Sequence, residues 1–352
     1  MTNNFICTKL PDSVTHAFID SDTIAYEAAF AVEKSRYQYT NTETLEKTVT
    51  FASAADGKQW LKQQAETAEI LCVEFNPDVW ARETIKVLGT EEEAVKASDH
   101  ALKGWLKHVK GLEWKGYFTE RDVLKSKDIK GLEKRYQGNR EKVRSPKFLV
   151  PCREHLLSKP EFSMVKGGFE ADAIVIAKAE KGGKTACLMS LDKDLRQAEN
   201  TYVIDRSYEP PMILIADNNA GGVWECPIKS KPAKKEYKYT GVGAKWLCFQ
   251  AVAGDNADGY GGVKGVGAKA VLQVLAPCVT HKDCAEAIYK EFYEPRGVFK
   301  YESWDGQLME LSPAEMMEQH FNLAYQERSP TDCWTFDKWG MERPSASNGE
   351  VL

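Results

Sequence analysis

The chain has 352 residues, of which 43% are hydrophobic and 11% aromatic, and its formal net charge at pH 7 is −5. This composition supplies enough apolar side chains for a sizeable core and excludes a chain that is disordered throughout. No run approaches the roughly 18 consecutive apolar residues of a membrane helix, and the first residues lack the apolar block of a signal peptide. We therefore expect a cytoplasmic protein with one large domain or two closely packed domains.

Cysteine and histidine are scattered along the chain. Nine cysteines and six histidines are present, without Cys-x-x-Cys or His-x-x-x-His spacing. Such a distribution argues against a zinc site and against a disulfide framework. The cysteines are expected to be reduced, with some of them in the core.

Hydrophobic periodicity predicts alternating strands and helices up to about residue 204. Thr90 and Glu93 form a capping-box pattern that opens a helix reaching residues 105–109. Further helices are expected at 23–32, 57–71 and 152–157, and another begins at 169 and ends at Gly182 and Gly183. Strands are expected at 16–20, 114–119, 185–191 and 201–204, and a hairpin within 36–53.

The last third of the chain is expected to be mainly helical. Before it, Met212–Ala216 and Val223–Cys226 flank an Asp-Asn-Asn-Ala-Gly-Gly sequence that predicts a hairpin. Lys229–Lys238 is interpreted as a linker, followed by a helix at 246–253, a Gly/Asp-rich turn and helices to about Gln326. The order of elements predicts an α/β sheet with helices on both faces, followed by a helical region.

Basic residues are concentrated in two stretches. Residues 121–147 have a net charge of +6 and residues 229–245 a net charge of +5, so the remainder carries −16. Both stretches could be solvated loops. They could also be phosphate-binding surfaces that accompany a carboxylate-rich site.

Acidic residues stand in pairs at the ends of expected elements. In open α/β sheets, ligands bind beyond the carboxyl ends of the strands, so paired acids at such ends are candidate ligand residues. Each pair alone could also be a helix cap or a turn. The pairs are Asp20 and Asp22, Glu170 and Asp172, Asp192 and Asp194, and Asp255 and Asp258.

Carboxylates gathered in one pocket would repel one another and raise each other's pKa values. Divalent cations relieve that repulsion, and oxygen-only ligands are what Mg²⁺ or Mn²⁺ prefers. Two such ions about 4 Å apart can activate a water molecule and stabilise the leaving oxygen of a phosphodiester. We therefore expect two Mg²⁺ or Mn²⁺ ions.

Four strings resemble motifs of one protein family. They are RYQGNR at 135–140, FEADAIVIA at 169–177, SLDKDLRQ at 190–197 and AVAGDNADGYGGVKGVGAKAV at 251–271. Together they resemble the 5′-nuclease, or flap endonuclease, superfamily, and the bacteriophage 5′→3′ exonuclease branch fits best. The resemblance runs from about Phe18 to Leu275 and covers residues 34–110 and the tail weakly.

The resemblance implies a PIN-like α/β nuclease domain at 1–228 with a helical arch at about 121–150. It implies a helical DNA-binding region at 229–352, with a helix–hairpin–helix variant at about 246–275. The implied activity is metal-dependent 5′→3′ exonuclease and structure-selective flap endonuclease cleavage of DNA, leaving 5′-phosphate and 3′-hydroxyl ends. The implied partner of this monomer is duplex DNA with free 5′ ends or flaps, and RNA–DNA hybrids are a further candidate. The alternatives are a PIN-type ribonuclease and a non-catalytic branched-DNA-binding protein.

Site residues follow from the same resemblance, position by position. The implied metal ligands are Asp20, Glu120, Glu170, Asp172, Asp192, Asp194, Asp255 and Asp258. The implied arch residues that act in catalysis are Arg135, Tyr136, Gln137 and Arg140. The implied DNA-binding residues are Lys134, Arg144, Lys264, Gly265, Gly267 and Lys269.

Three positions depart from the family pattern. Ala173 stands where many relatives have a second Asp after Glu-Ala-Asp. The acid after the strand at 114–119 is Glu120, with Asp122 as a rival. Gln137 replaces the arch lysine, so Lys134, Arg135 or Arg140 would have to supply that charge.

Overall fold

The fold is described from a computed structural model, and it covers residues 5–44, 48–120, 131–138, 144–168, 170–217, 219–227 and 237–345. The chain divides into two compact units, each built from separate segments. The boundary expected at residue 228 lies inside the first unit, so the division into nuclease and DNA-binding regions remains a prediction. The first unit comprises Met1–Thr23, Lys107–Arg144 and Leu157–Leu352, and the second comprises Ile24–Leu106 and Ser145–Leu156.

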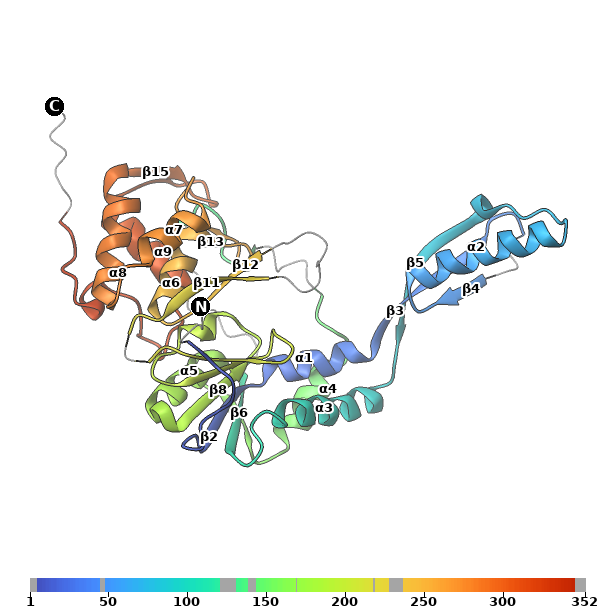
Figure 1. Ribbon diagram of the computed structural model, residues 1–352, viewed down its shortest axis with the longest axis horizontal. Helices are drawn as coiled ribbons and strands as arrows, with labels where there is room; N and C mark the ends of the chain where they lie inside the picture. Colours follow the sequence, from blue (N-terminus) through green and yellow to red (C-terminus); the bar gives the residue numbers. More distant parts are fainter. Residues whose placement is uncertain are drawn as a thin grey trace. The chain divides into compact units, whose positions relative to one another are not determined.

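Within the described residues, the first unit is organised around a seven-stranded sheet of order β1-β10-β9-β8-β2-β6-β7 (Figure 1). The strands β9, β8, β2, β6 and β7 run parallel, whereas β10 and β1 pair antiparallel at one edge. The α/β class with a central sheet, expected from the sequence, is confirmed. The strands are β1 (Ile6–Cys7), β2 (His16–Asp20), β6 (Glu113–Thr119), β7 (Phe162–Val165), β8 (Ala186–Ser190), β9 (Tyr202–Asp205) and β10 (Met212–Ile215).

The centre of this sheet is fully buried. All five residues of β8 are buried, as expected for a parallel strand covered on both faces. Helix α5 (Ala171–Gly182) packs against the sheet through Val175 and Ile176, which join Leu188 of β8 in one core cluster. The helix ends where Gly183 adopts a positive φ of 57°.

The order of the strands creates a switch point in the sheet. After β2 the chain builds β6 and β7 on one side of that strand, and then β8 and β9 on its other side. The connections therefore diverge at the carboxyl ends of β2 and β8, which is where open α/β sheets bind ligands. Asp20 is the last residue of β2, and Ser190 is the last residue of β8.

Helices at the C-terminal end of the first unit enclose a second core (Figure 1). Trp246, Leu247, Met317, Phe321 and Trp334 are among its buried side chains. The helices are α6 (Ala244–Ala253), α7 (Ala268–Leu275), α8 (His281–Ile288) and α9 (Pro313–Ala324), with a π-helical turn at Tyr289–Tyr293 and short 3₁₀ turns at Gly183–Thr185, Asp194–Gln197, Glu294–Arg296 and Asp337–Trp339. Three two-stranded ribbons accompany them: β11 (Gly222–Pro227) with β12 (Tyr237–Val242), β13 (Gly254–Asp255) with β14 (Tyr260–Gly261), and β15 (Phe299–Glu302) with β16 (Leu308–Leu311).

Two expectations about the second half were wrong. The hairpin predicted across 212–226 does not form, because β10 pairs with β9 and β1 whereas β11 pairs with β12. The intervening glycines turn the chain from one sheet to another, with Gly221 at a φ of 75°, instead of closing a hairpin. The helices expected to continue to Gln326 are interrupted by the β15–β16 hairpin.

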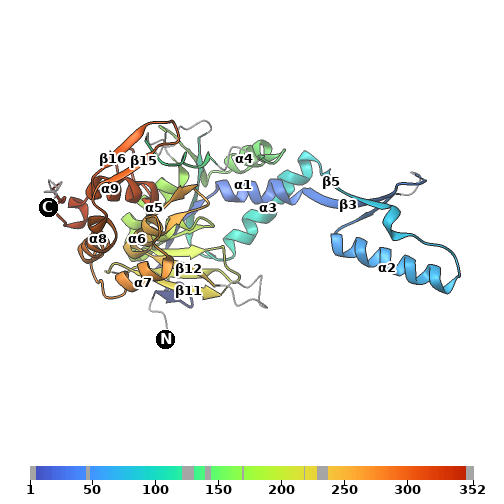
Figure 2. The same ribbon diagram turned by 90° about the horizontal axis from the view of Figure 1, so that it is seen from above.

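The second unit contains a three-stranded antiparallel sheet in its described residues (Figure 2). The hairpin expected at 36–53 is confirmed as β3 (Glu33–Asn41) and β4 (Thr48–Phe51), and β5 (Trp80–Leu88) adds a strand that the sequence did not suggest. Strands β3 and β5 pair from Glu33 opposite Leu88 onward, and the Gly89 N–H bonds the Val32 carbonyl at 2.8 Å. The helices are α1 (Asp22–Ala31), α2 (Ala54–Ile70), α3 (Glu91–Leu106) and α4 (Leu149–Leu157), with a 3₁₀ turn at Pro77–Val79.

The helices of the second unit were expected from the sequence close to where they lie. The capping box at α3 is confirmed, because the Glu93 N–H bonds Thr90 Oγ1 at 3.2 Å and the Thr90 N–H bonds Glu93 Oε2 at 2.8 Å. Trp60 of α2 lies against Trp80 of β5, with ring centroids 4.9 Å apart, which holds α2 on its sheet. Among the described residues, no helix is both long enough and apolar enough to cross a membrane.

Candidate metal centre

Asp20 is held at the switch point of the sheet. Its carboxylate is 7% exposed, and its Oδ2 accepts a hydrogen bond of 3.0 Å from the Ser190 hydroxyl. The same hydroxyl oxygen accepts the Asp192 N–H at 2.9 Å. Ser190 therefore connects the carboxyl end of β2 to the turn that carries Asp192.

The start of α5 brings two more acids to this edge. Glu170 is the N-cap residue, with extended backbone, and Asp172 lies in the first helical turn. The Ala171 N–H bonds Thr119 Oγ1 at 2.9 Å, which fixes the helix start to the end of β6. The Thr119 N–H in turn bonds Asp22 Oδ2 at 2.9 Å, so Thr119 organises acids from two elements.

Burial and neighbouring carboxylates raise the pKa values of Asp20 and Asp172. Burial, followed by the charges of Asp22 and Asp192, raises the pKa of Asp20 to about 7. Burial, followed by the charges of Glu170, Asp192 and Asp20, raises the pKa of Asp172 well above its usual range. We call Asp172 and the three acids whose charges raise its pKa, Asp20, Glu170 and Asp192, the first acidic group.

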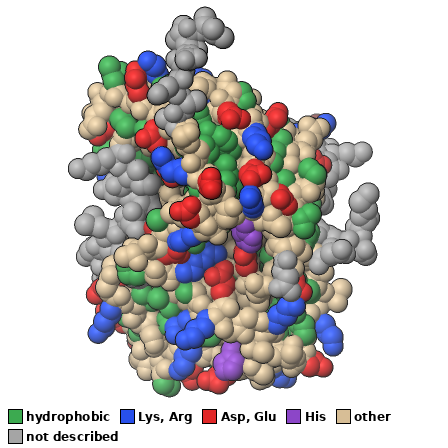
Figure 3. All heavy atoms as spheres, turned by 90° about the vertical axis from the view of Figure 1, so that its left-hand side faces the viewer, with side chains coloured by type: hydrophobic (Ala, Val, Ile, Leu, Met, Phe, Trp, Pro, Cys, Tyr) green, Lys and Arg blue, Asp and Glu red, His purple; other side chains and the backbone are tan. Residues whose placement is uncertain are grey.

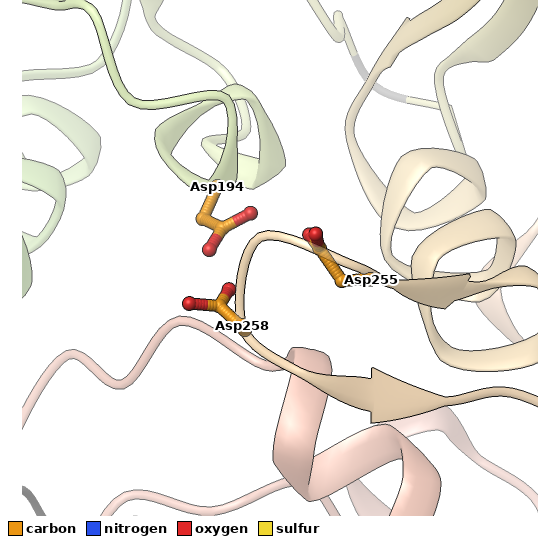
Figure 4. A group of neighbouring side chains, drawn as sticks. All are labelled: Asp194, Asp255 and Asp258. Carbon is orange, nitrogen blue, oxygen red and sulfur yellow. The ribbon is translucent and has the colours of Figure 1, made fainter. Parts of the chain in front are cut away.

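Asp194, Asp255 and Asp258 form a second acidic group (Figure 4). Their ligand oxygens all lie within 4.8 Å of one another, and no other set of three His, Cys, Asp or Glu side chains in the described residues meets this criterion. Asp194 begins the 3₁₀ turn after β8, Asp255 ends β13, and Asp258 lies in the turn to β14. Asp255 and Asp258 are 7% and 4% exposed.

Close backbone packing shapes the turn that carries Asp255 and Asp258. Gly254 has a φ of 77°, and a Cβ atom placed there would lie 2.3 Å from the Gly262 nitrogen. Only glycine fits this approach, because the obstructing atom belongs to the backbone. The turn is thereby fixed directly behind α6.

A described side chain donates a hydrogen bond to each carboxylate of the second acidic group. Gln137 Nε2 donates to Asp258 Oδ1 at 2.9 Å, and Gln250 Nε2 donates to Asp194 Oδ1. Lys193 Nζ forms an ion pair with Asp255 Oδ2.

Lys193 brings a positive charge to the second acidic group. Burial lowers the pKa of Lys193, but Asp194, Asp255 and Asp258 outweigh it, so the net pKa is raised and the ammonium is charged. The sequence did not single out Lys193 or Gln250. The position of Lys193 between two acids is a signal that could have been used, whereas Gln250 stands in an apolar helix and carries none.

The donor sets of both groups fit Mg²⁺ or Mn²⁺. They consist of carboxylate oxygens, without the thiolate or imidazole ligands that structural zinc sites use. At the second group the ammonium of Lys193 partly neutralises the carboxylates, as a bound cation would. The two groups are continuous, because the Asp194 N–H bonds Asp192 Oδ1 at 2.9 Å.

The other expected metal ligand, Glu120, is exposed directly after β6. No hydrogen bond or ion pair between described residues joins it to the first acidic group, so its role remains a prediction. Its rival Asp122 lies outside the described residues. Ala173 is buried on α5, where it supplies no ligand atom.

The part of the expected arch that is described contacts the helical end of the first unit. Tyr136 stacks on Tyr260, with ring centroids 6.4 Å apart, and the Arg135 guanidinium lies 5.5 Å from the centroid of Trp304. Leu132 is buried in the helical core. These contacts favour a packed role for Tyr136 over base stacking, and catalytic roles for Arg135 and Tyr136 remain predictions. Residues 121–130 and 139–143 of the expected arch, including Arg140, lie outside the described residues.

The turn between α6 and α7 is exposed where the sequence placed a DNA-binding hairpin. Gly265 has a φ of 79°, and Gly267 is the N-cap residue of α7 with extended backbone. A Cβ atom at either glycine would meet open space. Lys264 and Lys269 are exposed beside them, and Lys134 and Arg144 are exposed elsewhere in the unit. That this turn is a helix–hairpin–helix variant remains a prediction.

Comparison with solved structures gave several similar proteins from bacteriophage T5. A T5 5′-exonuclease with bound divalent metal ions (zinc) is 11% identical, with 88% of this chain and 89% of that chain covered and a TM-score of 0.37. The chain is thus similar, at low identity, to a T5 5′-exonuclease. A T5 protein co-crystallised with metal ions is also 11% identical, with 90% of each chain covered and a TM-score of 0.38. A T5 flap endonuclease in a pseudo-enzyme–product complex with DNA and metal ions is 11% identical, with 79% of each chain covered and a TM-score of 0.35.

The sequence motifs resemble the same family, that of 5′-exonucleases and flap endonucleases. No protein-family model and no curated protein matches the chain. At such low TM-scores a superposition transfers no detail of the site.

Proposed function

We propose that the chain is a metal-dependent 5′→3′ exonuclease with structure-selective flap endonuclease activity on DNA. The observation that supports this most directly is the convergence of carboxylates from β2, α5 and the turn after β8 at the switch point of the sheet. The hydrogen bond between Asp194 and Asp192 extends this arrangement into the second acidic group. An oxygen-only set of this size, in which Asp20, Asp255 and Asp258 are buried, is suited to two divalent cations and to phosphodiester hydrolysis.

Each acidic group would hold one ion. Asp20, Glu170, Asp172 and Asp192 would hold the first, and Asp194, Asp255 and Asp258 the second. Two bound ions supply an activated water for in-line attack and stabilise the leaving 3′ oxygen. Ser190 orients the Asp20 carboxylate and, with Thr119, fixes the backbone next to the other acids of the first group through the hydrogen bonds described above.

DNA would be held by particular elements of the first unit. The α6–α7 turn exposes backbone at Gly265 and Gly267 with Lys264 and Lys269 beside it, a combination suited to phosphate oxygens. Lys134 and Arg144 are exposed candidates for further phosphate contacts. The face drawn in Figure 3 carries Lys, Arg, Asp and Glu side chains in mixture, so that face is not a broad basic surface.

The test is cleavage of a labelled DNA duplex in Mg²⁺, in Mn²⁺ and in EDTA. We expect products to appear from the 5′ end and to carry 5′-phosphate, with cleavage abolished in EDTA and unaffected by blocked 3′ ends. An Asp192→Asn variant serves as the inactive control. Cleavage confined to RNA would support a ribonuclease instead, and tight DNA binding without any cleavage would support a non-catalytic binder.

A further inference from the structure

Lys193 reaches from the protein surface into the second acidic group. Its side chain is 31% exposed, whereas the side chain of its partner Asp255 is 7% exposed. The backbone of Lys193 is fixed, because its carbonyl accepts a hydrogen bond of 2.9 Å from Trp246 Nε1. Only the flexible side chain of Lys193 is therefore able to move relative to Asp255.

Both oxygens of Asp255 are occupied by protein donors. The Ala257 N–H donates to Oδ1 at 2.8 Å, and Lys193 Nζ pairs with Oδ2. A divalent ion bound through Oδ2 would place two positive charges within a few ångströms of the ammonium. Such repulsion in a partly buried site is strong, so the ion and the ammonium compete for the same oxygen.

We propose that Lys193 is a built-in counter-ion that holds Asp255 until the second divalent ion binds, and that it leaves Asp255 when that ion arrives. The second ion then binds by exchange with an ammonium, which makes it the weaker of the two. This inference rests on the proposed function, because it takes the second acidic group as a metal site. It assigns Lys193 a positioning role at that site.

The chemistry of lysine suits such an exchange. An ammonium is a compact charge on a flexible stem, whereas a guanidinium would hold a carboxylate through two parallel hydrogen bonds. Gln137 and Gln250 donate to the other two carboxylates without adding charge. Removing Lys193 from Asp255 therefore changes the charge of the second group by a full unit and leaves its two amide contacts in place.

The first experiment counts and titrates Mn²⁺ by electron paramagnetic resonance in the wild type, Lys193→Met and Lys264→Met. We expect two classes of site in the wild type, and in Lys193→Met a gain in affinity at the weaker class only, by about 10- to 100-fold, the range of a charged hydrogen bond. Lys264→Met removes the same charge from the exposed α6–α7 turn and should leave both affinities nearly unchanged. A single Mn²⁺ in the wild type, or equal gains in the two variants, would overturn the proposal.

The second experiment uses the wild-type chain and does not depend on a variant that folds. Amines are acylated with and without Mg²⁺, and the peptide containing Lys193 is quantified by mass spectrometry. We expect little labelling of Lys193 in EDTA and a clear increase at Mg²⁺ concentrations that fill both sites. Lys184, which is paired with Asp217, should show no such change. Labelling of Lys193 that does not respond to filling of the second site would overturn the exchange.

Neither measurement requires DNA cleavage. If Lys193 exchanges with the ion but no DNA is cut, the proposed activity fails and the inference stands. If DNA is cut in a Mg²⁺-dependent manner while Lys193 remains on Asp255, the inference fails and the proposed activity stands.

Discussion

Gln137 and Asp258 are joined by two hydrogen bonds across 121 residues of sequence. The Gln137 amide nitrogen Nε2 donates to Asp258 Oδ1 at 2.9 Å, and the Gln137 N–H donates to the Asp258 carbonyl at 2.7 Å. Gln137 adopts a φ of 53°, in the left-handed region. Gln137, which the family resemblance predicts to replace the arch lysine, therefore contacts the second acidic group.

The first prediction concerns this contact. In Gln137→Leu the backbone bond can persist but Asp258 loses the hydrogen bond from Gln137 Nε2, so the Mg²⁺ concentration for half-maximal cleavage should rise about tenfold, as for a hydrogen bond to a charged group. In Gln137→Lys an ammonium would compete with the ion, so the same quantity should rise. Metal titrations of the cleavage rate test both variants. If Gln137→Lys instead lowers the Mg²⁺ concentration for half-maximal cleavage, a lysine at this position aids cleavage more than the hydrogen bond from Gln137 to Asp258 does.

The second prediction concerns ligand charge. Asp192→Asn and Asp255→Asn each remove a charged ligand while keeping the side-chain volume. Loss of a hydrogen bond that supports a metal ligand typically costs roughly 10- to 100-fold in activity. Each of these variants should slow cleavage by more than that, while duplex binding is retained. Single-turnover rates and filter binding separate these effects. A slowing of tenfold or less, about the effect of one weak hydrogen bond, would remove that residue from the metal ligands.

The third prediction concerns pH. The pKa of Asp20 is raised to about 7 by burial and by the charges of Asp22 and Asp192. Because the folded chain binds this proton more tightly than the unfolded chain, the stabilisation is complete at low pH and is lost as the pH rises through about 7. The metal-free protein should lose about 2–3 kcal/mol of unfolding free energy from this group between pH 5 and pH 8. Urea titrations at several pH values in EDTA measure this.

Mg²⁺ should abolish the pH dependence that Asp20 causes, because a bound cation favours the ionised carboxylate. The matched control is Asp20→Asn, which cannot titrate at this position and should make the metal-free profile less steep, while the contribution of Asp172, whose pKa is also raised, persists. A stability that rises steadily from pH 5 to pH 8 in EDTA would contradict the shift at Asp20.

The fourth prediction concerns the α6–α7 turn. Gly267 has extended backbone and open space around its Cβ position, so Gly267→Val should fold normally and still weaken duplex binding if the backbone approaches a phosphate. Gly265→Ala, by contrast, should lose about 1–2 kcal/mol of stability, since Gly265 has a positive φ. Replacing Lys264 and Lys269 by Ala should make the dependence of log affinity on log salt shallower by about 0.9 for each phosphate that the two lysines neutralise. An unchanged salt slope in the variant with both lysines replaced, together with normal duplex affinity in Gly267→Val, would show that DNA is not bound at the α6–α7 turn.

The sequence predicted features that depend on short-range signals. Asp20 and Asp192 were predictable because strand ends follow from apolar runs, and the ends of parallel strands meet at one edge. The hairpin across 212–226 was predicted wrongly because its turn residues are equally suited to a change of sheet, and only the pairing of β10 with β9 decides between the two.

The unpredicted part depends on contacts between distant segments. Gln137 approaches Asp258 because residues 131–138 pack on the helical end, through Leu132 and Tyr136. No periodicity at Gln137 or Asp258 encodes that approach. Strand β5 was missed for the same reason, since its partner β3 lies before α2 in the chain.

The two ends of the segment 33–88 lie side by side. Glu33 pairs with Leu88, and the Gly89 N–H bonds the Val32 carbonyl. Residues 33–88 are therefore a closed excursion between two strands, β2 and β6, that are already neighbours in the sheet. A segment with adjoining ends can be lengthened, exchanged or excised with only a short turn in its place, because the register of β2 against β6 does not depend on it. Residues 33–88 can therefore vary in sequence and length without a change at the acids of the switch point.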